Sequence, residues 1–137
     1  MKRNATAVWN GTIKEGSGHL TTQSKTLNET QYSFKSRFED GVGTNPEELM
    51  AAAHAGCFTM KLSADLTAAG FTPDSLETTC NIILEAGTIT NSDLVTTARI
   101  SGIDDAEFQK IAAGAKAECP VSKAYNVKIS LQATLVS

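Results

Sequence analysis

Alternating apolar and polar residues predict strands near both ends of the chain. Three strands are expected before residue 40, over residues 5–14, 19–24 and 27–38. In the last of these, Tyr32, Phe34 and Phe38 fall in phase, as one half-buried face of a strand requires. Three further strands are expected over residues 76–88, 94–101 and 127–135.

A long apolar segment in the middle of the chain predicts a helix over residues 46–69. Thr44 or Asn45 can cap it, Pro46 suits its first position, and the glycine that follows it ends it. Such a helix is ~36 Å long. Because residues 49–60 carry no formal charge, the helix is apolar nearly all round. We expect one face to pack on the chain's own sheet and a second copy of the chain to cover the opposite face.

The remaining elements complete an α+β order. Acidic residues in the first turn predict a second helix over residues 104–118, and Pro120 begins a short helical turn that ends at Ala124. The predicted order is three strands, helix, two strands, helix, strand, and helices set among antiparallel hairpins are typical of α+β folds. The chain has 137 residues and no internal repeat or linker, so a single domain over residues 1–137 is expected.

Composition and charge narrow the classes of partner. Hydrophobic residues make up 41% and charged residues 20% of the chain, as in an ordinary globular protein. The net charge of −3 and the lack of a basic run argue against nucleic acid and anionic membrane surfaces as partners. Neither a secretory signal nor a run of ~20 apolar residues is found, so we expect a cytoplasmic protein.

The three cysteines, Cys57, Cys80 and Cys119, suggest redox chemistry rather than a scaffold. Their number is odd and they form no Cys-x-x-Cys pair, so neither a zinc site of the usual spacing nor a disulfide framework is expected. Small residues around Cys57 leave room for another molecule to approach its sulfur. Cys119 lies at a helix break, where exposed backbone N–H groups favour a thiolate.

Arg37 and Glu47 are candidates for an ion pair beside Cys57. A thiolate in such an electropositive pocket can attack a peroxide. The competing interpretation is a buried structural thiol, because free cysteine is among the most buried residue types. Cys80 is assigned a structural or incidental role. His54 is a candidate general base, although packing or hydrogen bonding near a dimer centre is the favoured role.

The spacing of Glu47 and Cys57 constrains this site. The two residues are ten positions apart, which is ~15 Å of rise on one straight helix. Both therefore cannot touch one substrate oxygen from a single copy. Either the helix is broken near Cys57, or Glu47 and Cys57 meet across a dimer interface, and the apolar helix favours the interface.

Motifs along essentially the whole chain resemble those of the OsmC/Ohr family of thiol peroxidases. They are Arg37-Phe38-Glu39, Gly43-Thr44-Asn45-Pro46-Glu47-Glu48-Leu49, Ala52-Ala53-His54-Ala55-Gly56-Cys57-Phe58, Ala69-Gly70-Phe71-Thr72-Pro73 and Cys119-Pro120-Val121-Ser122. The positions of Arg37 and His54 are more similar to the osmotically inducible OsmC branch than to Ohr.

The resemblance implies both a fold and an activity. The fold would be OsmC-like, with antiparallel sheets wrapped around a long central helix in an intertwined homodimer. The activity would be reduction of organic hydroperoxides, with Cys57 as the peroxidatic and Cys119 as the resolving cysteine. Arg37 and Glu47 would keep the Cys57 thiolate reactive. A dithiol of the dihydrolipoamide type would reduce the Cys57–Cys119 disulfide, and no metal or bound cofactor would be needed.

An apolar wall beside the thiolate would favour an alkyl hydroperoxide as substrate. Candidates for this wall are Phe38, Leu49, Met50 and Phe58. Two other classes of function stay open. One is a non-catalytic redox-sensing or lipid-binding dimer that uses the same pocket, and the other is a structural dimer with inert thiols.

Overall fold

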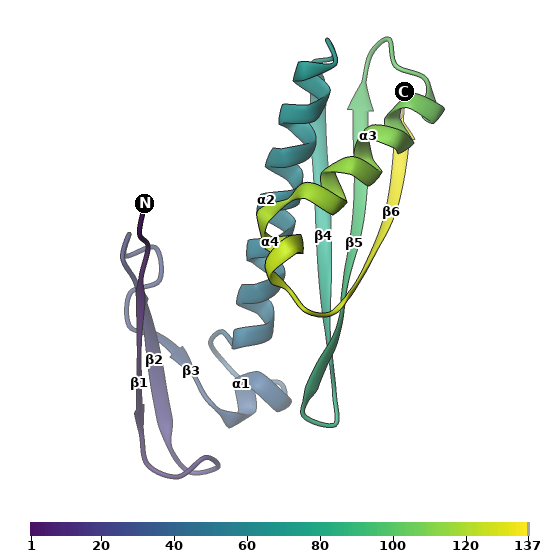
Figure 1. Ribbon diagram of the computed structural model, residues 1–137. Coiled ribbons are helices and arrows are strands. Elements are labelled where there is room, and N and C mark those ends of the chain that lie inside the picture. The colour runs from purple at the N-terminus through teal and green to yellow at the C-terminus, as the bar shows by residue number, and fades with distance from the viewer. Residues whose placement is uncertain (137) are drawn as a thin grey trace. The chain divides into compact units, whose positions relative to one another are not determined.

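The computed structural model describes residues 1–136 and divides into two compact units, one up to Leu49 and one from Met50 onward (Figure 1). The elements in chain order are β1 (Ala5–Asn10), β2 (Ser17–Thr22), β3 (Thr30–Tyr32), α1 (Phe34–Phe38), α2 (Pro46–Ala68), β4 (Pro73–Glu85), β5 (Thr88–Ile100), α3 (Asp105–Glu118), α4 (Pro120–Ala124) and β6 (Lys128–Val136). The single domain expected over residues 1–137 stays a prediction.

The first unit contains an antiparallel sheet in the order β1-β2-β3. β1 and β3 are shorter than predicted, since β1 already ends at Asn10 and β3 spans only Thr30–Tyr32, whereas β2 begins two residues earlier than expected. Trp9 and Tyr32 meet edge to face over Gly18, with ring centroids 5.4 Å apart. A Cβ atom at Gly18 would come within 2.6 Å of the Trp9 ring, so this contact requires glycine.

The prediction of one strand over residues 27–38 is wrong in its second half. The chain turns into α1 at Phe34, because Ser33 and Ser36 form a capping box in which each side chain bonds the other's backbone N–H. Phe34 and Phe38 stack with ring centroids 5.0 Å apart. A spacing of four residues places two side chains on one face of either a strand or a helix, so the alternation could not separate the two.

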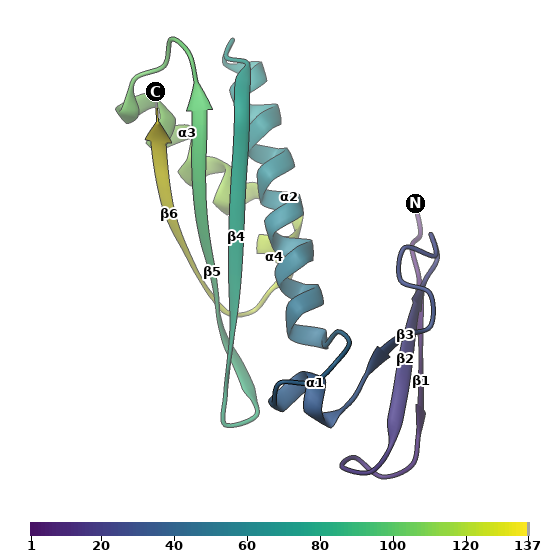
Figure 2. The same ribbon diagram turned by 180° about the vertical axis from the view of Figure 1, so that it is seen from behind.

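The second unit is a three-stranded sheet in the order β4-β5-β6, with α2 and α3 on one face (Figures 1 and 2). β4 and β5 form an antiparallel hairpin that turns at Ala86 and Gly87. The expectation of antiparallel pairing throughout is wrong for β6, which runs parallel to β5. The α3–α4 segment separates these strands, and such a helical crossover returns the chain in the same direction.

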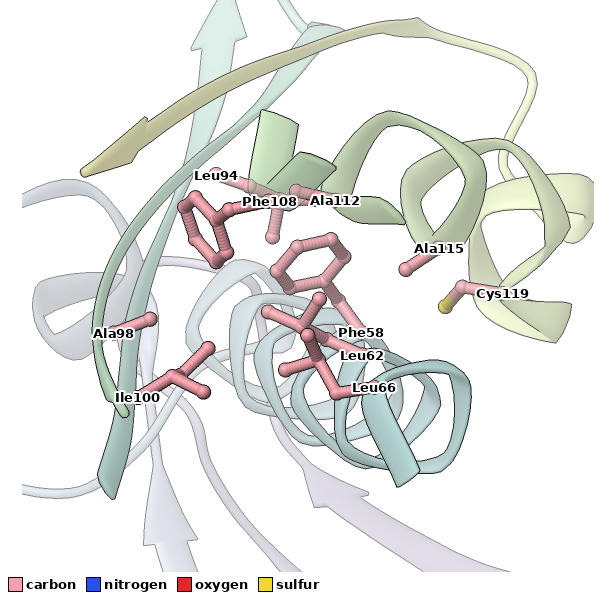
Figure 3. Close-up of a cluster of buried hydrophobic side chains, with 10 residues drawn as sticks. All are labelled: Phe58, Leu62, Leu66, Leu94, Ala98, Ile100, Phe108, Ala112, Ala115 and Cys119. Carbon is pink, nitrogen blue, oxygen red and sulfur yellow. The ribbon is translucent and has the colours of Figure 1, made fainter. Parts of the chain in front are cut away.

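The core of the second unit lies between this sheet and its helices (Figure 3). Its buried hydrophobic residues are Phe58, Leu62, Leu66, Leu94, Ala98, Ile100, Phe108, Ala112, Ala115 and Cys119. Along α2, His54, Phe58, Leu62 and Leu66 recur at every fourth position and are all 0% exposed. On another face Met60 is 76% exposed. One face of α2 therefore packs on its own sheet, as predicted.

Candidate active site

Cys57 and Cys119 lie side by side, although 62 residues separate them in the sequence. Their sulfur atoms are hydrogen-bonded at 2.9 Å, and both thiols are free. Cys57 projects from α2, and Cys119 stands between α3 and α4. A covalent S–S bond is ~2.05 Å long, so only a small approach separates this dithiol from a disulfide.

Pro120 places Cys119 at the break between the two helices. The residue before a proline is pushed out of the helical region, and Cys119 accordingly has φ −57° and ψ 126°. Its backbone N–H still bonds Ala115 O at 3.0 Å, and its carbonyl accepts from Lys123 N at 3.1 Å. Cys119 therefore ends α3 and begins α4, which fixes its sulfur at the edge of the core.

The two thiols have opposite tendencies to ionise. Burial and the hydrogen bond with Cys119 raise the pKa of Cys57. Burial also acts to raise the pKa of Cys119, but the hydrogen bond with Cys57 and the polar groups of Ser122 and Val121 outweigh it and lower that pKa. The direction of this shift agrees with the thiolate that the place of Cys119 before Pro120 predicts.

Arg37 and Glu47 form an ion pair within the first unit. Arg37 donates from Nε and Nη2 to Glu47 Oε1 at 3.1 and 2.9 Å. The Arg37 side chain is 38% exposed and that of Glu47 is 11% exposed. The sequence placed Arg37 on a strand, but it lies on α1. The guanidinium keeps donors and exposed surface available beyond its bond to Glu47, so it can face a further anion.

Hydrogen bonds between α1 and the start of α2 hold this ion pair in register. Asn45 caps α2 by accepting from Glu48 N at 2.8 Å, and its amide donates to Ser36 O at 2.9 Å. The Ser36 hydroxyl donates to Thr44 O at 2.8 Å. Arg37 follows Ser36 and Glu47 follows the cap, so the same contacts that end one helix and begin the next bring both charges together.

A cavity of about 240 Å³ in the first unit includes Arg37 in its wall. The other lining residues are Trp9, Ile13, Tyr32, Ser33, Phe34 and Phe38. The guanidinium also lies 5.1 Å from the centroid of the Phe38 ring. Of the residues proposed for an apolar wall, Phe38 lines this cavity. Phe58 is wrong for that role, because its side chain is fully buried in the core.

Residues 38–132 match a family model described as OsmC-like protein. The chain is also 45% identical over 141 residues to the peroxiredoxin OsmC of Escherichia coli (strain K12), which covers 100% of this chain and 99% of that relative. The chain belongs to the OsmC family. The motifs quoted above thus identified the family correctly.

Two solved structures of OsmC family members are similar to this one. An OsmC-like protein from Vibrio cholerae gives a TM-score of 0.77 at 13% identity, covering 97% of this chain and 99% of the other. An organic hydroperoxide resistance protein OsmC from Legionella pneumophila gives 0.67 at 22% identity, covering 98% and 97%. These likenesses confirm an OsmC-like α+β fold, whose strand pairs are antiparallel except for β5 and β6.

In this OsmC family member the four predicted site residues form two pairs. Cys57 pairs with Cys119 in the second unit, and Arg37 pairs with Glu47 in the first. The alternative of a helix broken near Cys57 is wrong, because α2 is continuous from Pro46 to Ala68. A single helix therefore still separates Glu47 from Cys57 by ~15 Å of rise.

The sequence favoured packing or hydrogen bonding for His54, but sequence reasoning missed its two partners, Ser92 and Ser122. His54 is fully buried and bonds Ser92 Oγ through Nδ1 at 2.5 Å and Ser122 Oγ through Nε2 at 2.8 Å. Cys80 Sγ bonds Ser92 Oγ at 3.1 Å. The alternation of β5 could have shown that Ser92 is buried, because Ser92 lies on the same face of this strand as Leu94 and Ala98.

Metal and membrane sites were also considered over residues 1–136. In that part of the chain no group of three or more His, Cys, Asp and Glu side chains is placed to hold a metal ion. None of the helices described there is long and apolar enough to cross a membrane.

Proposed function

We propose that this OsmC family member is a thiol peroxidase that reduces organic hydroperoxides to alcohols, with Cys57 as the peroxidatic and Cys119 as the resolving cysteine. The observation that carries the proposal is the pair of free thiols with sulfurs 2.9 Å apart. Membership of the OsmC family and 45% identity to a protein named as a peroxiredoxin support it.

The proposed reaction uses sulfur chemistry alone. The Cys57 thiolate attacks the distal peroxide oxygen, the O–O bond breaks, and the alkoxide leaves and takes up a proton as the alcohol. Cys57 is now a sulfenic acid. The Cys119 thiolate attacks its sulfur, forms the Cys57–Cys119 disulfide and expels hydroxide. An external dithiol, for which the dihydrolipoamide type is proposed, reduces this disulfide by thiol–disulfide exchange.

Arg37 and Glu47 are proposed to activate Cys57 from a second copy of the chain. Burial and the Cys119 hydrogen bond raise the pKa of Cys57, so a reactive thiolate needs a cation beside it. The continuity of α2 argues against Glu47 reaching Cys57 along the same helix. A homodimer would bring the Arg37–Glu47 pair of one copy to Cys57 of the other, and would cover Met60 of α2. Arg37 would then also stabilise charge developing on the peroxide.

The aromatic cavity beside Arg37 supports an organic substrate. Trp9, Tyr32, Phe34 and Phe38 line it, and such walls bind an alkyl or aryl group better than water-like hydrogen peroxide. We propose that the organic group of the hydroperoxide occupies this cavity while its O–O bond faces Arg37.

A comparison of Cys57→Ser, Cys119→Ser and Cys80→Ser with the parent protein tests the function. Cumene hydroperoxide and dihydrolipoamide are supplied, and turnover and the masses of the protein and its peptides are measured. We expect Cys57→Ser to abolish turnover and Cys119→Ser to stall with oxidised Cys57. Cys80→Ser, the matched control, should keep turnover. Treated with the hydroperoxide alone, without the dithiol, the parent should lose two hydrogen atoms per chain, mapped to Cys57 and Cys119.

Other outcomes would overturn the proposal in distinct ways. Full turnover by Cys57→Ser would remove Cys57 from the reaction. Stoichiometric oxidation of the parent without turnover by any dithiol would point to a redox sensor. Native thiols that react with neither hydroperoxide nor a thiol reagent would indicate a structural role only.

A further inference from the structure

The short helix α4 is bounded by a residue with non-helical backbone at each end. Cys119, before it, has φ −57° and ψ 126°, and Tyr125, after it, has φ −81° and ψ 119°. Backbone bonds close the helix itself, since Lys123 N donates to Cys119 O at 3.1 Å and Tyr125 N donates to Val121 O at 3.0 Å. Residues at the ends of an element are those that absorb a hinge motion, so α4 can turn as one body and carry Cys119 with it.

Two side chains at α4 bond residues of α2 that are one helical turn apart. The Tyr125 hydroxyl donates to Met50 O at 3.0 Å, and the Ser122 hydroxyl is hydrogen-bonded to His54 Nε2 at 2.8 Å. The Tyr125 and His54 rings also meet edge to face, with centroids 5.3 Å apart. His54 is 0% exposed and Ser122 is 9% exposed, so their bond is shielded from water. We call these two hydrogen bonds and the ring contact the latch.

Contacts with α3 restrain α4 less than the latch does. Lys123 pairs with Glu118 at 3.0 Å, but their side chains are 60% and 63% exposed, and such surface ion pairs contribute little. Val121 is only partly buried against the core. The backbone joins Cys119 to α3 by the bond from its N–H to Ala115 O. The latch therefore supplies the buried polar contacts that hold α4 in place.

We propose that Tyr125 and Ser122 are positioning residues for the resolving cysteine: by latching α4 to α2, they keep the Cys119 sulfur against Cys57 instead of letting it move away with α4. The resolving role of Cys119 rests on the proposed function. Both residues act through the placement of α4, which maintains the 2.9 Å contact between the sulfurs and the full burial of Cys119.

The placement of Cys119 matters because a sulfenic acid on Cys57 has two fates. Attack by the Cys119 sulfur gives the disulfide and expels hydroxide, whereas reaction with a second hydroperoxide molecule gives sulfinic acid and an alcohol. The first reaction is intramolecular and needs the two sulfurs in contact, and the second does not. A latched α4 therefore favours the disulfide over further oxidation of Cys57.

Alkylation of Cys119 by iodoacetamide tests the latch without any hydroperoxide. In the Cys57→Ser/Cys80→Ser background Cys119 is the only cysteine left. Its side chain is fully buried, so the reagent reaches it when α4 opens, and the rate constant is proportional to the opening equilibrium. Measurement over a series of pH values separates a change in opening from a change in the pKa of the thiol. Circular dichroism of each variant establishes that it is folded.

We expect Tyr125→Phe, which removes only the hydroxyl, to raise this rate constant about fivefold at every pH, the factor of one lost hydrogen bond. Ser122→Ala, an independent change, should raise it by a similar factor. Two control variants should change it by less than about twofold. Lys123→Ala breaks only the exposed ion pair of α4, and Thr96→Val removes a buried hydroxyl of the same unit that bonds β4. A rate constant unchanged in Tyr125→Phe and Ser122→Ala, or raised equally in the controls, would overturn the proposal.

Urea distinguishes opening of α4 from unfolding of the second unit. A local opening exposes little surface, so below the unfolding transition the alkylation rate constant should be nearly independent of urea, in the background and in Tyr125→Phe alike. A rate constant that rises with the slope of global unfolding would overturn the proposal, because Tyr125 would then only stabilise the fold.

Oxidation by excess cumene hydroperoxide, without a dithiol, links the latch to the reaction. With all three cysteines intact, Tyr125→Phe/Ser122→Ala should give a larger share of Cys57 as sulfinic acid than the parent does, and a correspondingly smaller share of disulfide, as read by peptide mass. Equal shares in the two proteins would overturn the positioning role. A parent protein that never oxidises Cys57 would overturn the proposed function instead, and the alkylation experiment would still test the latch.

Discussion

The two halves of the candidate site are held in place in different ways. The Arg37–Glu47 pair joins residues ten positions apart through caps and turns, and the arginine is 38% exposed. The Cys57–Cys119 pair joins residues 62 positions apart, and Cys119 is fully buried at the edge of the core. The charged half therefore depends on local structure, whereas the sulfur half exists only when the second unit is packed.

Truncating a core side chain should expose this difference most strongly. Phe58 is 0% exposed and follows Cys57 on α2, so Phe58→Ala is expected to lower the free energy of unfolding by about 3–5 kcal/mol. Phe38→Ala makes the same chemical change in the first unit, where the ring is 48% exposed, and should cost about 1 kcal/mol or less. Urea unfolding of both variants measures the contrast, and equal losses would contradict it.

Replacing the arginine should show the opposite behaviour, a large loss of activity with little loss of stability. Arg37→Met is expected to lower peroxidase turnover by about 10²–10³-fold, as removal of a preorganised charge does in other sites. The free energy of unfolding should change by less than about 1 kcal/mol, because the ion pair is partly exposed. Arg37→Lys keeps the positive charge, so its turnover should lie between that of Arg37→Met and that of the parent. Parent-like turnover by Arg37→Met would remove Arg37 from the mechanism.

The same variant tests whether the Arg37–Glu47 pair acts on the Cys57 sulfur. If Arg37 lies beside the thiolate, alkylation of Cys57 in the parent should proceed well below the free-thiol pKa of ~8.5. In Arg37→Met the midpoint should move above that value, because burial and the Cys119 hydrogen bond, which both raise the pKa of Cys57, then act unopposed. An identical alkylation profile in both proteins would show that the arginine does not reach Cys57.

The contrast also explains how much of the site could be predicted from the sequence. Helix α2 was predicted almost to the residue, because Asn45, Pro46 and Gly70 are local signals. The Cys57–Cys119 pairing came from family resemblance, since no periodicity brings together residues 62 positions apart. Helix α1 was missed because the spacing of Phe34 and Phe38 fits the period of a strand as well as that of a helix. The parallel pairing of β6 was missed because it depends on the helical crossover before β6, and the alternation of apolar and polar residues does not show strand direction.

The pH dependence of stability should give the smallest effect. The pKa of His54 is lowered from 6.5 by burial, so the unfolded chain binds a proton at a higher pH than the folded one does. The contribution of neutral His54 to the free energy of unfolding is therefore fully present above pH 6.5. It is lost as the pH falls toward the pKa that His54 has in the folded protein. Through this one group, the free energy of unfolding changes by at most about 1.4 kcal/mol per pH unit.

His54→Gln removes this titration and places an amide where it can still bond Ser122. Urea unfolding at a series of pH values from about 7 to about 5 should show the stability advantage of the parent over His54→Gln shrinking as the pH falls. His54 belongs to the packed second unit, whereas the Arg37–Glu47 pair lies in the first unit. Arg37→Met should therefore follow the parent's pH profile, and parallel curves for His54→Gln and the parent would mean that His54 is not buried as a neutral ring.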